Sequence, residues 1–153
     1  MVKPFLVERN DGKLHLSWNL NANVGFASPN HQDDVELVQL GYFIMGRRKF
    51  GAMPADLIEM MSNLRVGAFC TGRMDDPLVQ LIFAHQKHRK STVDGRVSVI
   101  SNSTGTFGSE VYLLGSLINN IFADQPELFP RVDKHPKCGN TLRQSVIEGV
   151  AHM

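Results

Sequence analysis

Several features that would assign a protein class are missing from this 153-residue sequence. No apolar run reaches the ~20 residues that a membrane-spanning helix needs, and the first residues lack the basic and apolar regions of a secretion signal. The formal net charge of +1 argues against a dedicated nucleic-acid-binding protein. We therefore expect a protein that is cytoplasmic as synthesised, with no membrane span and no nucleic-acid partner, while export by a route without a signal peptide stays open.

Catalytic and cofactor motifs are missing as well. The sequence has neither the Gly-x-Ser-x-Gly motif of serine hydrolases nor a phosphate-binding loop. His85 and His88 stand three residues apart on a predicted helix, close enough to share a metal, but no third ligand follows at a diagnostic spacing. We predict no metal site, no cofactor and no catalytic residue.

Cysteine is scarce, with only Cys70 and Cys138 in the chain. Because no secretion signal is visible, we expect two reduced, structural thiols, and a Cys70–Cys138 disulfide is the alternative. A nucleophilic Cys70 would need a base such as His85 or His88 within hydrogen-bond reach, which a sequence cannot establish. The nucleophile therefore stays the less favoured interpretation.

Two pairs of carboxylates stand at predicted helix starts, Asp33-Asp34 and Asp75-Asp76. Adjacent residues at a helix start point in different directions, so neither pair suits a general acid and base acting together. The positive end of the helix dipole favours negative charge at such positions. We expect these residues to act as caps and dipole partners.

The N-terminal segment has the pattern of a β-hairpin. Leu14, Leu16 and Trp18 alternate with polar residues, and the preceding Asn10-Asp11-Gly12 offers a tight turn. A lone two-stranded hairpin is marginal in water, so we expect it to pack on helices, with Trp18 as a core anchor.

Apolar residues at helical spacing predict five helices in the rest of the chain. The third is the clearest, because Asp76 suits its N-cap, Pro77 its first turn, and basic residues from Lys87 to Lys90 its C-terminal end. We expect its packing partner to be the first helix, around residues 33–39. The other helices are predicted to begin near an Asn30 N-cap, at Pro54, near Val111, and at a capping box formed by Thr141 and Gln144.

One arrangement of motifs resembles a known family. A loop containing Val24-Gly25 leads into a helix with the signature Asp-Val and Val-Gln over Asp33 to Gln39. A later helix ends in Phe83 to Gln86, and a tight turn, Val93-Asp94-Gly95, follows it. This order resembles peptidoglycan-binding-like domains, and the resemblance covers roughly residues 24–117.

The chain also departs from the family pattern. The second helix, Pro54 to Leu64, stands as an insertion, and Gly108 to Tyr112 would open the final family helix. Four further positions differ from the usual family residues: Cys70-Thr71-Gly72 replaces Val-Asp-Gly, Met74-Asp75 replaces an aromatic-glycine pair, Leu78 replaces Thr, and His85 replaces Phe.

The resemblance implies a mainly α fold, a compact helical bundle of peptidoglycan-binding-like type with an N-terminal β-hairpin and an extra C-terminal helix. It implies three regions: residues 1–23 as a hairpin extension, 24–123 as the helical domain with an insertion at 47–69, and 124–153 as a connector with a short helix. We expect the turns of this bundle to converge at one end, where small domains usually carry recognition.

The function implied is that of a bacterial, non-catalytic module that binds a peptidoglycan fragment of the cell wall through loop residues Arg73, Asp75 and Asp94, together with Tyr42. Two alternatives stay open. One is a toxin or hydrolase that reaches the cell wall without a signal peptide. The other is a protein-interaction component of a phage or secretion apparatus, whose partner is a protein.

Overall fold

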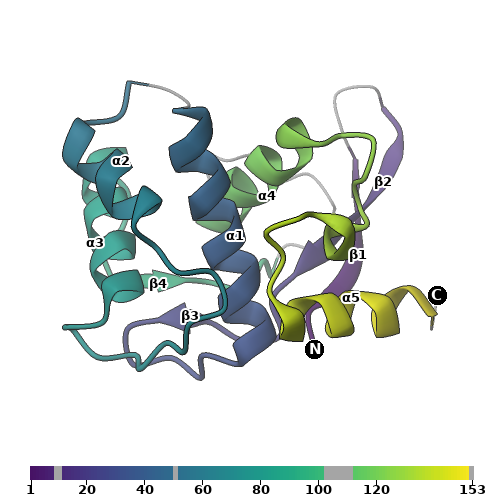
Figure 1. Cartoon of the computed structure of the whole chain (residues 1–153), viewed down its shortest axis with the longest axis horizontal. Coiled ribbons are helices and arrows are strands. Elements are labelled where there is room, and N and C mark those ends of the chain that lie inside the picture. The colour runs from purple at the N-terminus through teal and green to yellow at the C-terminus, as the bar shows by residue number, and fades with distance from the viewer. Residues whose placement is uncertain (9–11, 50–51, 102–111, 152–153) are drawn as a thin grey trace.

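The longest helix, α1 (Gln32–Arg48), runs through the centre of the molecule (Figure 1). The computed structural model describes residues 1–8, 12–49, 52–101 and 112–151. These residues form a mainly helical structure with two small antiparallel sheets. The other elements are β1 (Lys3–Glu8), β2 (Leu14–Asn19), β3 (Val24–Gly25), α2 (Ala55–Ser62), α3 (Pro77–Arg89), β4 (Arg96–Val97), α4 (Leu113–Asp124), the 3-10 helix η1 (Val132–Lys134) and α5 (Asn140–Ala151).

Apolar side chains on every side of α1 explain its central position. Val35, Leu37, Val38 and Leu40 are all fully buried, which is the pattern of a helix surrounded by other elements. Asp33 and Asp34 lie in its first turn, as predicted for dipole partners, but neither caps the helix. Oδ2 of Asp33 instead accepts from the Val2 amide at 2.6 Å, and Oδ1 of Asp34 accepts from the Asn21 amide at 2.9 Å. The helix therefore serves as the common packing surface for the rest of the chain.

The main partner of α1 is α4, whereas the sequence predicted α3. A glycine explains the close approach: a Cβ atom on Gly41 would lie 2.7 Å from the Cβ atom of Leu117 in α4. The predicted partner also contacts α1, through a buried pair of side chains. The Tyr42 hydroxyl lies 3.0 Å from Nδ1 of His85, and the two rings meet edge to face.

Helix α3 forms as its sequence predicts. Asp76 is the N-cap, and its Oδ1 accepts hydrogen bonds from the backbone amides of Leu78 at 2.8 Å and Val79 at 3.4 Å. Pro77 occupies the first turn, where a missing amide hydrogen costs nothing. The helix ends at Arg89, and Lys90 takes the left-handed conformation that terminates it.

Two predicted caps are wrong. Asn30 is not the N-cap of α1; it has a φ of +52°, and its side chain bonds to the backbone amide and carbonyl of Gly25. Thr141 does not cap α5, because that helix already begins at Asn140. The donor that a cap would satisfy, the Leu142 amide, instead bonds at 2.9 Å to Oε1 of Glu36 in α1.

The N-terminal hairpin is confirmed, with β1 and β2 antiparallel and Pro4 opposite Trp18. Trp18 is fully buried, and its Nε1 donates to the Pro130 carbonyl at 2.6 Å. Its ring also approaches Gly149 of α5. The predicted Asn10-Asp11 turn and the predicted helix opening at 108–111 lie outside the described residues.

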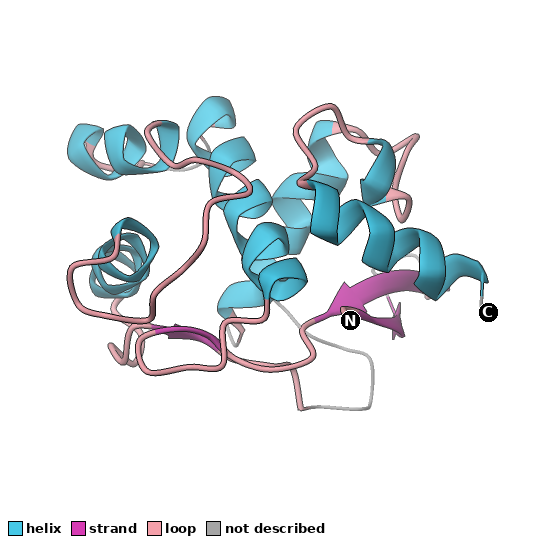
Figure 2. Ribbon diagram, turned by 60° about the horizontal axis from the view of Figure 1, so that its bottom comes forward, coloured by secondary structure: helices cyan, strands magenta, loops and turns pink. Residues whose placement is uncertain are grey.

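A second sheet was not predicted. The segment before α1 was expected to be loop, but Val24 pairs with Val97 and Gly25 with Arg96. Figure 2 shows the two sheets apart from each other, β1–β2 beside α5 and β3–β4 beside α3. No helix among the described residues has both the length and the apolar character to cross a bilayer.

We expect acid to weaken the fold through His85. Burial, with smaller effects from Arg89 and His88, lowers the pKa of His85 from 6.5 to about 4. The unfolded chain therefore binds this proton at a higher pH than the folded chain does. The contribution of His85 to the free energy of unfolding is complete above pH 6.5 and is lost between pH 6.5 and 4. The full difference is about 3 kcal/mol in the free energy of unfolding.

Urea denaturation of the natural chain and of His85→Gln between pH 8 and 4 measures this effect. The variant lacks the titrating group, so its free energy of unfolding should decrease less over that range. Equal pH dependence in both proteins would contradict the assignment.

We also expect Gly139→Ala to destabilise the protein by about 2 kcal/mol, because the new methyl group would overlap the Glu36 carboxylate. Thr141→Ala is the matched control. Thr141 is exposed inside the first turn of α5, so its loss should stay within about 0.5 kcal/mol. Chemical denaturation measures both changes. A large loss of stability in Thr141→Ala would show that Thr141 does cap α5.

Candidate recognition site

The turn after α3 is organised by one buried side chain, Gln86, which is 5% exposed. Its Oε1 accepts from the backbone amides of Asp94 at 3.1 Å and Gly95 at 2.8 Å. Its Nε2 donates to Oδ1 of Asp94 at 3.0 Å and to the Arg96 carbonyl at 2.9 Å. A primary amide is suited to this position because it carries two donors and an acceptor with two lone pairs.

The glycine turns converge, as the sequence predicted. The amide of Phe26 bonds to the Gly95 carbonyl at 2.8 Å, and the amide of Ala27 bonds to the Gly72 carbonyl at 2.9 Å. Gly95 has a φ of +73°, which favours glycine, and a Cβ atom there would collide with Phe83. The turns before and after α3 are therefore held against one segment that begins at Gly25.

A pocket of about 520 Å³ opens beside the second turn. Its wall is built by Arg89 and Lys90 at the end of α3, Asp94 in the turn, Arg96 in β4, and Tyr112 before α4. The side chains of Ser91, Thr92 and Ser98 add hydroxyl groups. Three cationic groups against one carboxylate make this a site for a polar, negatively charged ligand.

The position of each basic group follows from the local structure. Lysine and arginine at the last turn of α3 face the negative end of its dipole. Arg96 lies in β4, where its Nε donates to the Phe26 carbonyl at 2.9 Å and its backbone amide donates to Oδ1 of Asp94 at 3.0 Å. Asp94 thus holds the turn and lines the pocket at once.

The four residues predicted to bind a ligand lie in three places. Asp94 is in the pocket. Arg73 and Asp75 form an ion pair of 3.8 Å before α3, where both side chains are 78% exposed, and they do not line the pocket. Tyr42 has no exposed surface, so it belongs to the core and a ligand on the surface does not reach it.

Sequence reasoning missed Gln86, Arg89, Lys90 and Arg96. The basic run was visible, but the helix dipole alone explained it. Gln86 stood in the motif at the end of the helix, eight residues before Asp94. Its role became visible only when the turn folded back onto the helix.

The other candidate chemistry has a structural explanation. Cys70 and Cys138 are buried and free, which confirms the expectation of two reduced thiols. Burial raises the pKa of Cys70 to about 11 and of Cys138 to about 12, so neither is a thiolate at neutral pH. Among the residues that the structure describes, no group of three histidine, cysteine or acidic residues could hold a metal.

We expect Gln86→Glu to destabilise the protein by about 3 kcal/mol. A carboxylate cannot donate, so it would face the Asp94 carboxylate and the Arg96 carbonyl without a hydrogen atom between them. Gln80→Glu is the control, because Gln80 is an exposed residue of the same helix. Urea denaturation at pH 7 measures both variants, and equal stability would show that the amide does not hold the turn.

Comparison of the chain with protein-family models, with curated proteins and with solved structures finds no match. What the chain can bind therefore follows from the geometry of the site. That geometry is a polar, cationic pocket beside a turn held by Gln86.

Proposed function

We propose that this chain is a non-catalytic recognition module related to peptidoglycan-binding-like domains, and that it binds a fragment of the bacterial cell wall. The observation that carries the proposal is the pocket beside the Val93-Asp94-Gly95 turn, where three cationic side chains and several hydroxyl groups surround one carboxylate. Peptidoglycan offers matching chemistry, since its short peptides carry free carboxylates and its sugars carry hydroxyl groups.

The arrangement of elements also supports the proposal. Two turns with left-handed glycines, Gly72 and Gly95, flank α3 and are tied to one loop that begins at Gly25. Gly95 belongs to the Val93-Asp94-Gly95 motif of the family resemblance, whereas Gly72 keeps only the glycine of the usual Val-Asp-Gly. The Arg73–Asp75 pair, at the other end of α3, is a second contact point for a ligand longer than the pocket.

Binding without catalysis is the interpretation that the chemistry favours. The two thiols are protonated at neutral pH because burial raises the pKa of each. The buried His85 has its Nδ1 beside the Tyr42 hydroxyl in the core. The thiols and His85 are therefore core groups and do not form a nucleophile and base pair at the surface.

The test is retention of the purified chain on insoluble peptidoglycan, with an unrelated protein of similar size as the reference. We expect retention above that reference, and about fivefold weaker binding for Lys90→Gln, because a charge in the pocket is lost. Lys87→Gln is the matched control, because Lys87 is an exposed lysine in the last turn of α3 that does not line the pocket.

Each result has a clear meaning. No retention of the natural chain would remove the proposed function. Equal losses in Lys87→Gln and Lys90→Gln would remove the pocket as the binding site. Soluble muropeptides released during the incubation would show a hydrolase instead of a binding module.

A further inference from the structure

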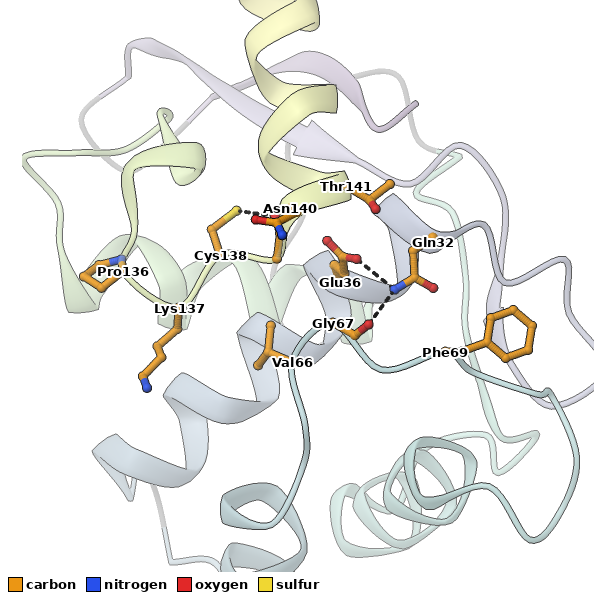
Figure 3. Close-up of a pocket in the computed structure, with 11 residues that line it drawn as sticks. Gln32, Glu36, Val66, Gly67, Phe69, Pro136, Lys137, Cys138, Asn140 and Thr141 are labelled. Atoms are coloured by element: carbon orange, nitrogen blue, oxygen red, sulfur yellow. Dashed lines mark hydrogen bonds between the residues drawn. The ribbon is translucent and has the colours of Figure 1, made fainter.

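A second pocket, of about 590 Å³, lies on the surface of α1 (Figure 3). One wall is the loop at residues 66–69, and the other is the segment at 136–141 that leads into α5. Gln32 and Glu36 of α1 lie between the two walls. The pocket therefore exists only because the C-terminal segment packs beside the loop that follows α2.

The charged groups of this pocket are engaged inside the protein. Oε1 of Glu36 accepts from the Leu142 amide at 2.9 Å, and Oε2 accepts from Nε2 of Gln32 at 2.8 Å. Nζ of Lys137 lies 5.7 Å from the centroid of the Phe43 ring, within the range of a cation–π contact. One carboxylate and one ammonium also cancel, so the lining gives no preference for a charged ligand.

An exposed aromatic residue forms one end of the pocket. Phe69 is 76% exposed, although burying such a ring would stabilise the fold by roughly 2 kcal/mol. Its loop is held firmly, because Gln39 accepts from the Gly67 amide at 2.9 Å and donates to the Ala68 carbonyl at 2.9 Å. An aromatic ring presented on a fixed loop loses little conformational entropy when a ligand packs on it.

The remaining groups are amides, a hydroxyl and apolar surfaces. Nε2 of Gln32 already donates to Glu36 at 2.8 Å and to the Gly67 carbonyl at 3.0 Å, so Gln32 offers a ligand its Oε1 as an acceptor. Asn140 adds an amide and Thr141 adds a hydroxyl. Val66 and Pro136 line the pocket with apolar groups. This mixture fits a ligand with hydroxyl groups on its edges and C–H groups on its faces.

We propose that this pocket binds an uncharged oligosaccharide. One sugar ring packs on Phe69, and the hydroxyl groups of its neighbour bond to Gln32, Asn140 and Thr141. Figure 3 shows the Phe69 ring turned away from Glu36, so a ligand must extend beyond a single ring to reach both ends. The site shares no lining residue with the cationic pocket and does not rest on the function proposed for that pocket.

The experiment is titration of the full chain with three neutral tetrasaccharides, chitotetraose, cellotetraose and maltotetraose, followed by isothermal calorimetry and by NMR amide shifts. We expect at least one of them to bind, with shifts at residues 66–69 and 136–141. Phe69→Ala should weaken that binding at least tenfold. Asn140→Ala should weaken it as well.

Met74→Ala is the matched control, because Met74 is an exposed apolar residue, 56% exposed, outside the pocket. Met74→Ala and Lys90→Gln should both bind the tetrasaccharide with the affinity of the natural chain. The proposal would be overturned if none of the tetrasaccharides bound up to millimolar concentration. It would also be overturned if Phe69→Ala bound as tightly as the natural chain. If Lys90→Gln loses retention on peptidoglycan but still binds the tetrasaccharide, the loss concerns the cationic pocket. This result would separate the two proposals.

Discussion

Buried side-chain amides hold the loops of this protein in place. Gln86 binds the turn at Gly95, Gln39 binds the loop at Gly67, and Asn30 binds Gly25. In each case the amide accepts from a backbone N–H and donates to a backbone carbonyl of the same segment. Backbone groups in an irregular buried segment need such partners, because leaving one without a hydrogen bond costs about 1 to 3 kcal/mol.

These amides also shape both pockets. Gln86 lines the cationic pocket and fixes Asp94, while Gln39 fixes the loop that carries Phe69. The walls of each pocket are therefore set before a ligand arrives. Preorganisation of this kind favours binding, because the loops lose little conformational entropy when a ligand binds.

The C-terminal segment depends on one residue of the central helix. Glu36 supplies the N-terminal hydrogen bond of α5 from α1, and Gly139 provides the room for its carboxylate. The same carboxylate places a negative charge at the start of α5, where the helix dipole would otherwise favour an anion. The two pockets consequently differ in chemistry, since one is cationic and the other is neutral.

Local interactions were predictable from the sequence, and long-range ones were not. The sequence by itself determined the hairpin around Trp18, the helix that starts at Asp76 and Pro77, and the glycine turns, because each depends on residues within a few positions of one another. Tertiary structure alone decided that Glu36 replaces Thr141 as the cap of α5 and that Tyr42 is buried against His85. Sequence spacing carries no information on such contacts, since their partners lie on separate elements that only packing brings together.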